Sequence, residues 1–122
     1  MANKTSAIYA IRCKSTGKVY IGRSQNPRER MRQHFNLLKK GDRASCGAES
    51  FREDFARYGA ADFELFILER GVTPENFRER EAYWINEYRA TDRRYGYNKD
   101  PMETNFVIHI SDGLPPKPGQ RN

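Results

Sequence analysis

The chain of 122 residues has the size of one domain with a single core, and its seven Tyr, seven Phe and one Trp exclude a disordered tail. No stretch approaches the ~20 apolar residues of a membrane span and no apolar run follows Met1, so we expect a cytoplasmic protein with no membrane partner. The net charge of +6 is concentrated in residues 1–43, where 11 Lys and Arg stand against 2 Asp and Glu. This clustering favours DNA or RNA as the partner over a merely solvated face or an anionic membrane.

The first structured segment is expected to be a β-hairpin. Residues 7–13 and 18–24 are rich in β-branched and aromatic side chains, and a turn-like stretch separates them. Tyr9 and Tyr20 lie on these strands, and Gly22 marks a bulge or a close backbone approach. If the turn pairs Tyr9 with Gly22, both rings share one face and the missing side chain leaves Tyr9 open to a ligand. A turn longer or shorter by one residue would separate the rings.

A helix is predicted at about 27–40. Asn26 is a suitable N-cap, Pro27 suits the first helical position, and Gly41 ends the run. The side chains expected to face the core are Met31, Phe35 and Leu38.

Arg30 and His34 lie four residues apart, each one residue before a core position, so they should edge the buried stripe. Each has two readings. Arg30 is either a surface contact for phosphate or carboxylate or a catalytic group, and His34 is either a satisfied helix residue or a proton shuttle.

A second helix is predicted at about 49–58, with Gly59 as its C-cap. The dense apolar run from Phe63 to Leu68 has strand length and is bounded by Asp62 and Gly71, which predicts a third strand. The core stripe of the second helix consists of Phe51, Phe55 and Tyr58.

The next predicted helix carries a carboxylate where apolar side chains are expected. Thr73 and Pro74 open it as N-cap and first residue, and it ends near Arg89. Glu81 lies in the middle of its apolar stripe, and an ionised carboxylate in such a seam is costly unless it is compensated. A cation partner, a hydrogen-bond network or a metal ion would each compensate it, and a structural Glu paired with Arg is as good a reading as a metal ligand. The stripe consists of Phe77, Trp84, Ile85 and Tyr88.

The remaining sequence predicts little further structure. Residues 95–98 are turn-like and aromatic, 106–110 could form a short extra strand, and the proline-rich residues 114–122 are expected to be extended and mobile. The folded domain should therefore span residues 1–100, followed by an extension over 101–122. The cysteines and histidines lack the spacing of a zinc site: these are Cys13, Cys46, His34 and His109.

Taken together, these motifs resemble the GIY-YIG nuclease family, and most closely the catalytic domains of phage-type homing endonucleases. The resemblance spans about residues 7–100 and rests on the order Ala7-Ile8-Tyr9, Val19-Tyr20-Ile21-Gly22, Arg30, His34, Glu81 and Asn98. It implies an α+β fold in which about three helices flank a three-stranded antiparallel sheet.

The resemblance also implies a reaction and a set of catalytic residues. A phosphodiester bond would be hydrolysed with one divalent metal held by Glu81, and a carboxylate suits Mg²⁺, with Mn²⁺ expected to substitute. Tyr9 would take a proton from the attacking water with support from Tyr20, and Arg30 would stabilise the charge of the transition state. A phenol titrates near ~10, so Tyr9 needs help at neutral pH, and His34 is the candidate helper.

Five further residues are expected to contact the substrate: Gly22, Arg43, Asn98, Lys18 and Arg23. The sequence departs from the family pattern at two places. Ala7 stands where the first motif has Gly, which leaves the tyrosine chemistry intact. A second histidine beyond the first helix is missing, and Arg43 is the candidate substitute as a phosphate contact.

The leading hypothesis is therefore a metal-dependent DNA endonuclease. The alternatives are a catalytically silent nucleic-acid-binding module and a structure-specific repair or RNA-cleaving nuclease. The residues from Pro101 are too few for a separate recognition region. The chain is therefore expected to be either an excised catalytic module or a stand-alone nuclease with weak specificity or with targeting by a partner. Duplex cleavage would need a homodimer or two successive nicks.

Overall fold

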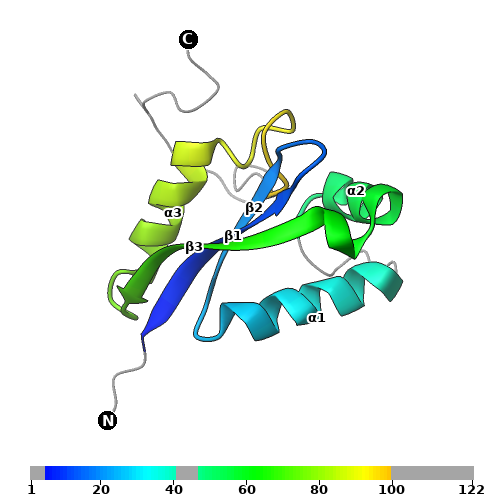
Figure 1. Ribbon diagram of the computed structural model, residues 1–122. Helices are drawn as coiled ribbons and strands as arrows, with labels where there is room; N and C mark the ends of the chain where they lie inside the picture. The colour runs from blue at the N-terminus through cyan, green and yellow to red at the C-terminus, as the bar shows by residue number, and fades with distance from the viewer. Residues whose placement is uncertain (1–4, 41–46, 100–122) are drawn as a thin grey trace.

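The computed structural model describes residues 5–40 and 47–99 (Figure 1). It confirms the α+β fold, with three antiparallel strands and three α-helices in these ranges. Arg43, residues 106–110 and the extension over 101–122 lie outside the described residues. The elements in chain order are β1 (Ser6–Cys13), β2 (Val19–Ser24), α1 (Pro27–Lys40), α2 (Glu49–Tyr58), the 3₁₀ helix η1 (Ala60–Asp62), β3 (Phe63–Val72) and α3 (Phe77–Tyr88).

The sheet has the order β2-β1-β3, and both pairs of neighbouring strands are antiparallel. Tyr9 lies opposite Gly22 and Ile11 lies opposite Tyr20, so the register that places both tyrosines on one face is confirmed. The pairing of β1 with β3 is irregular between Ser6 and Tyr9. The central strand β1 is almost wholly buried, because it has a strand on either side and helices over both faces.

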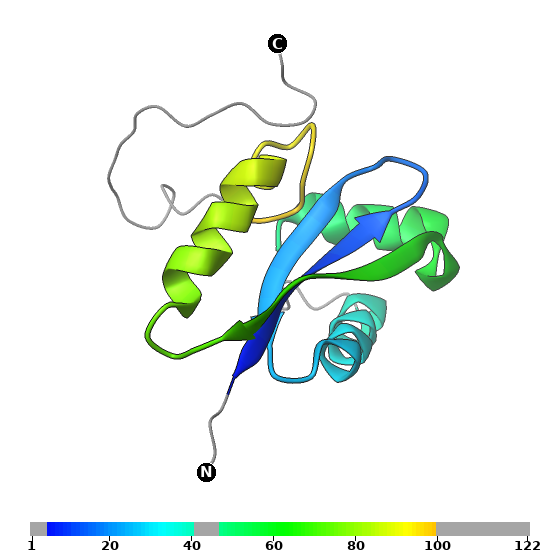
Figure 2. The same cartoon turned by 60° about the vertical axis from the view of Figure 1, so that its left-hand side comes forward.

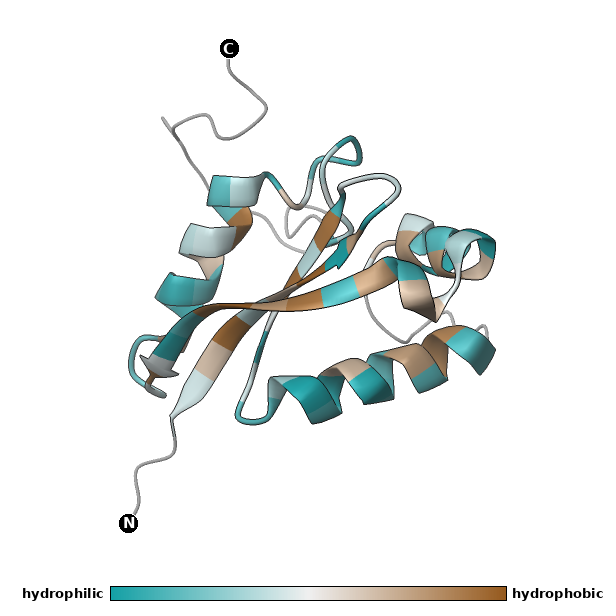
Figure 3. Ribbon diagram, in the orientation of Figure 1, coloured by the Kyte–Doolittle hydropathy of each residue, from teal (hydrophilic) through white to brown (hydrophobic). Residues whose placement is uncertain are grey.

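The two faces of the sheet carry separate cores. Alternation along β1 sends Tyr9 and Ile11 to the face covered by α1 and α2, and Ile8 and Ala10 to the face covered by α3 (Figures 1 and 2). The strands are largely brown and the outward helix faces teal in Figure 3, which is the pattern of a sheet buried between amphipathic helices. The first core is mainly aromatic and includes Phe51, Phe55, Phe63 and Tyr97, whereas the second combines Ile21, Val72 and Ala90 with the inner face of α3.

The helix boundaries test the capping signals in the sequence. The predicted ranges 27–40 and 49–58 match α1 and α2, and the expected C-cap Gly59 has a φ of 84°, where a side chain would be strained. The prediction for α3 is wrong at its start: the helix begins at Phe77, not at Thr73. The Asn76 side chain accepts a hydrogen bond from the Thr73 backbone N–H at 2.9 Å, which holds residues 73–76 as a turn.

Strand β3 is longer than the apolar run predicts, since it continues beyond Leu68 to Val72. Glu69 pairs with Ile8 of β1 through the backbone, and its carboxylate accepts hydrogen bonds from Arg80 Nε and Trp84 Nε1 of α3, both at 2.9 Å. A polar residue therefore continues the strand because a helix across the sheet provides partners for it. As the outer strand, β3 leaves Phe66 44% exposed.

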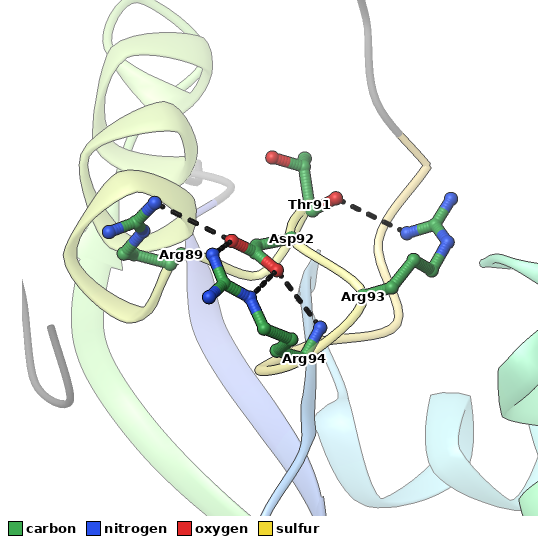
Figure 4. A network of polar contacts seen from close by, with 5 residues as sticks. All are labelled: Arg89, Thr91, Asp92, Arg93 and Arg94. Atoms are coloured by element: carbon green, nitrogen blue, oxygen red, sulfur yellow. Dashed lines mark hydrogen bonds and ion pairs between the residues drawn. The ribbon is translucent and has the colours of Figure 1, made fainter.

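The outer edge of β2 is partly covered by the segment that follows α3. Val19 exchanges backbone hydrogen bonds with Tyr95 and Tyr97, and the Asn98 side chain binds the Ile21 N–H at 2.8 Å and the Ile21 C=O at 2.9 Å. A polar network shapes the loop that leads to this segment (Figure 4). Its centre is Asp92, whose carboxylate binds the Arg94 backbone N–H and guanidinium and the Arg89 guanidinium.

Among the described residues, no helix has the length and apolar character needed to cross a bilayer.

We predict that Gly96→Ala strongly destabilises the fold, by about 3 kcal/mol, because the new Cβ would overlap the Ala90 backbone, which cannot move aside as a side chain would. Gly59→Ala is the control. Its Cβ meets nothing within 4 Å, so only the positive φ opposes it, at about 1–2 kcal/mol. Urea unfolding measures both variants, and equal losses would contradict the close approach of residue 96 to Ala90.

Candidate active site

The Tyr9 hydroxyl is buried beside a histidine. Tyr9 lies in the middle of β1, its side chain is 1% exposed, and its Oη is 2.9 Å from His34 Nε2 of α1. The His34 side chain points from α1 toward the sheet and is fully buried, which brings its imidazole to the Tyr9 hydroxyl. The sequence predicts that His34 edges the buried stripe and does not face open water. Its exclusion from water is confirmed, but the ring lies in the core and not at its edge.

Gly22 makes this arrangement possible. A Cβ at this position would lie 2.5 Å from Tyr9 Oη and 2.6 Å from Tyr9 Cζ, far inside van der Waals contact. The missing side chain was expected to leave Tyr9 open to a ligand, but the Tyr9 ring itself fills the space. Gly22 is thus required for the position of the phenol.

Tyr20 completes an aromatic group around the hydroxyl. Its ring centroid lies 6.5 Å from that of Tyr9 and 5.0 Å from that of His34, which it meets edge on. The other side of Tyr20 stacks on Phe51 of α2, with centroids 5.3 Å apart. The second helix therefore contributes to the site by fixing Tyr20, a role that the sequence does not distinguish from ordinary core packing.

His34 is neutral at physiological pH. Burial lowers its pKa from 6.5 to about 4, and the neighbouring charge of Arg30 acts in the same direction. Its Nδ1 has no hydrogen-bond partner among the described residues. Arg30 is half-buried, and its Nη1 donates to Gln33 Oε1 at 3.1 Å. None of the ion pairs between described residues involves Arg30, so its charge is not neutralised by a carboxylate there.

Glu81 lies on α3, across the sheet from Tyr9. It is half-buried, and burial raises the pKa of its carboxyl, while the positive charge of Arg23 opposes that rise. The Glu81 carboxylate forms no ion pair or hydrogen bond within residues 5–40 and 47–99, so the alternative of a carboxylate locked onto a guanidinium is not seen there. The Arg23 guanidinium lies 3.7 Å from the Phe77 ring centroid and 3.5 Å from Ser6 Oγ.

The two groups of residues flank the outer edge of β2. Backbone groups of Val19 and Ile21 point to this edge, where residues 95–98 bind them. By alternation the backbone of Arg23 points the same way. The edge near residues 22–23 is therefore flanked by Tyr9, Tyr20 and His34 on one face and by Glu81 and Arg23 on the other.

Two of the expected substrate contacts lie apart from this edge or are already engaged. Lys18 precedes β2 at the hairpin end, next to the Tyr97 ring and about five residues, or ~17 Å of extended chain, from Arg23. The Asn98 amide is bound at both ends by the Ile21 backbone. Its direct effect in this structure is to hold β2 in place.

We predict that His34 makes the protein less stable in mild acid. Its unfolded pKa near 6.5 exceeds the folded value of about 4, so the unfolded state binds the proton first as the pH falls. The free energy of unfolding should be unaffected above pH ~6.5 and fall by up to about 3 kcal/mol between pH ~6.5 and ~4. His34→Gln, which keeps an amide near Tyr9, should lose this component. Denaturant titrations at several pH values test it, and identical pH dependence in both proteins would contradict it.

Comparison with known proteins gives a family and two structural neighbours. A family model described as the GIY-YIG catalytic domain matches residues 5–98. The chain is 33% identical over 94 residues to the intron-associated endonuclease 1 of Enterobacteria phage T4, covering 76% of this chain and 36% of that protein. It thus spans about a third of the length of that relative.

The structural neighbours are two structures of one catalytic domain. The catalytic domain of the homing endonuclease I-TevI superposes with a TM-score of 0.67 at 30% identity, covering 78% of this chain and 98% of that one. A mutant catalytic domain of the intron endonuclease I-TevI gives the same TM-score and identity, covering 77% and 92%. With the family model matching most of the chain and the sheet and helices in the same arrangement, this chain belongs to the GIY-YIG family.

Proposed function

We propose that this domain is a metal-dependent DNA endonuclease that hydrolyses phosphodiester bonds at the outer edge of β2, near residues 22–23. The observation that carries the proposal is the buried hydrogen bond between Tyr9 and a neutral His34, across the edge strand from a carboxylate without a described ion-pair partner. Family membership and the printed names of the relatives, an intron-associated endonuclease and a homing endonuclease, support the same reaction class.

The proposed proton transfer uses Tyr9 and His34 together. As the tyrosine oxygen accepts a proton from the attacking water, its own phenolic proton passes to His34 Nε2 over the 2.9 Å contact. The unprotonated imidazole can accept it, and an anionic phosphate nearby would raise the pKa of His34 and favour the imidazolium that forms. Because Tyr9 is 1% exposed, the water would have to enter beside Gly22 as the substrate binds.

Arg30 and Tyr20 would act around this pair. The Arg30 charge lies close enough to His34 to lower its pKa, which puts it near the reacting group, where it would stabilise the negative charge of the transition state. Tyr20, held between His34 and Phe51, would keep the Tyr9 hydroxyl oriented.

Glu81 fits a metal ion of the magnesium type. Mg²⁺ is commonly held by one or two carboxylates, with water and substrate phosphate as its other ligands. Among residues 5–40 and 47–99, no cluster of three or more His, Cys, Asp or Glu is placed for a metal ion. A half-buried carboxylate that forms no described ion pair does suit a hydrated ion, with Mn²⁺ as a substitute. When bound, the ion would neutralise charge on the phosphate and the leaving oxygen.

Substrate choice and assembly are proposed more coarsely. The basic residues 1–43 favour a nucleic acid as the substrate. DNA is proposed because the relatives are an intron-associated and a homing endonuclease, with RNA as the alternative and the cytoplasm as the proposed compartment. The match covers 36% of the phage relative, so target recognition is assigned to a separate domain, a partner or a homodimer.

Glu81→Ala is expected to reduce Mg²⁺-dependent plasmid cleavage by at least about 100-fold, because it removes the proposed metal ligand, while DNA binding stays within about threefold. Glu79→Ala is the matched control, since Glu79 is an exposed carboxylate in the first turn of the same helix. Full cleavage by Glu81→Ala would exclude this carboxylate as the ligand. No cleavage by well-folded wild type with Mg²⁺ or Mn²⁺ would favour the silent binding module.

Tyr9→Phe is expected to lower kcat by about 100-fold or more with little change in KM, because it removes the proton acceptor and leaves the ring in place. Single-turnover cleavage separates the chemical step from binding. Unchanged single-turnover rates would remove Tyr9 from the reaction.

A further inference from the structure

A groove lies on the α1 face of the sheet, between the start of α1 and the second half of β3. Its volume is about 400 Å³. Met31 of α1 and Leu65 and Ile67 of β3 line it with apolar surface, and these side chains pack against the first core. The other lining residues are Asn26, Pro27, Arg28 and Arg70.

The two arginines give the groove a positive charge with no acid in its lining. Arg28 and Arg70 are both exposed, and neither side chain forms an ion pair or hydrogen bond with another residue in the described ranges. Two nearby arginines do form ion pairs: Arg32 with Glu29 along α1, and Arg80 with Glu69 of β3. The charges of Arg28 and Arg70 are therefore available to an external anion.

The floor of the groove limits what the anion can be. A small inorganic ion would satisfy the arginines and leave the apolar surface uncovered. A sugar-phosphate backbone satisfies both, because its phosphates suit guanidinium groups and its sugar rings can lie on Met31, Leu65 and Ile67. The positive end of the α1 dipole adds to the same preference.

The groove is also close to the proposed reaction site. Only residues 24–27 connect Arg23, at the reactive edge of β2, to Arg28, so the two Cα atoms are at most about 18 Å apart. One strand of a duplex has a phosphate about every 3.4 Å along the axis, so that separation corresponds to about five nucleotides.

We propose that this groove, bounded by Arg28 and Arg70, binds the DNA backbone about five nucleotides or fewer from the bond that is cleaved. The inference rests on the proposed nuclease function. The groove positions the duplex and takes no part in bond cleavage, so its loss weakens binding and leaves the chemical step intact.

The test is the salt dependence of DNA binding by the full chain. A fluorescent 30-bp duplex is titrated by anisotropy without divalent metal between 50 and 200 mM salt. Each lost phosphate contact lowers the slope of log K against log salt by about 0.9, so Arg28→Gln and Arg70→Gln should each lower it by about 1 and the double variant by about 2. Arg57→Gln, an exposed arginine of α2, is the matched control and should leave the slope unchanged. Both target positions are exposed, and should the double variant not fold, the single variants carry the test.

Cleavage assays distinguish failure of this inference from failure of the proposed function. With Mg²⁺, the double variant should show a raised KM and an unchanged single-turnover rate at saturation. If wild type cleaves and the variants keep the wild-type slope, the groove does not bind DNA. If wild type does not cleave but the variants show a smaller slope of log K against log salt, the proposed function is wrong while DNA binding by the groove is supported. Displacement of the duplex by polyglutamate of equal charge would assign the groove to acidic protein instead.

Discussion

The position of β2 depends on the Asn98 side chain, which binds both backbone groups of Ile21. An edge strand normally has one hydrogen-bonded neighbour. Here Asn98, which is 77 residues from Ile21 in the sequence, also forms hydrogen bonds with the outer side of β2. Loss of that amide would leave two buried backbone groups of Ile21 without partners, at about 1–3 kcal/mol each. Gly22 directly follows this anchored residue, and its contact with the Tyr9 ring leaves no room for a shift of the strand. Hydrogen bonding at the edge therefore fixes the geometry of the tyrosines.

Burial acts on the two ionisable groups of the candidate site in opposite directions, with one physical cause. Removal from water disfavours the charged form, so it lowers the pKa of His34 and raises that of Glu81. The imidazole is left free to accept a proton. A positive ion would stabilise the partly buried Glu81 carboxylate more than an exposed one. Arg23 does not form an ion pair with it, because the Arg23 guanidinium stacks on Phe77. Placing these groups on opposite faces of a thin strand keeps each environment separate.

Local signals in the sequence were sufficient for much of this fold. Proline, asparagine and glycine at their preferred positions predict the ranges of α1 and α2. The sequence also predicts the hairpin but leaves its register open, and the structure has the register in which Tyr9 pairs with Gly22. The start of α3 was missed because Asn76 competes for the turn through its side chain, an interaction that a capping pattern alone does not resolve.

Features that depend on tertiary packing could not be predicted from the sequence. The complete burial of His34 depends on how α1 rests on the sheet, and the attachment of Asn98 to Ile21 joins residues 77 positions apart. Arg28 and Arg70 are ordinary exposed arginines in the sequence, and only the packing of α1 against β3 brings them to one groove. The tyrosines and Glu81 could be chosen as candidates from sequence, but which of them share a face could not.

The outer strand β3 has a consequence for the behaviour of the protein in concentrated solution. A ten-residue edge with an exposed Phe66 is a template on which other chains can add as strands. Charged side chains interrupt it on both sides of that ring, with Glu64 held by Arg12 and Arg70 projecting near the far end. A chain that added to this edge would have to bury those charges, which opposes association of the domain through its sheet.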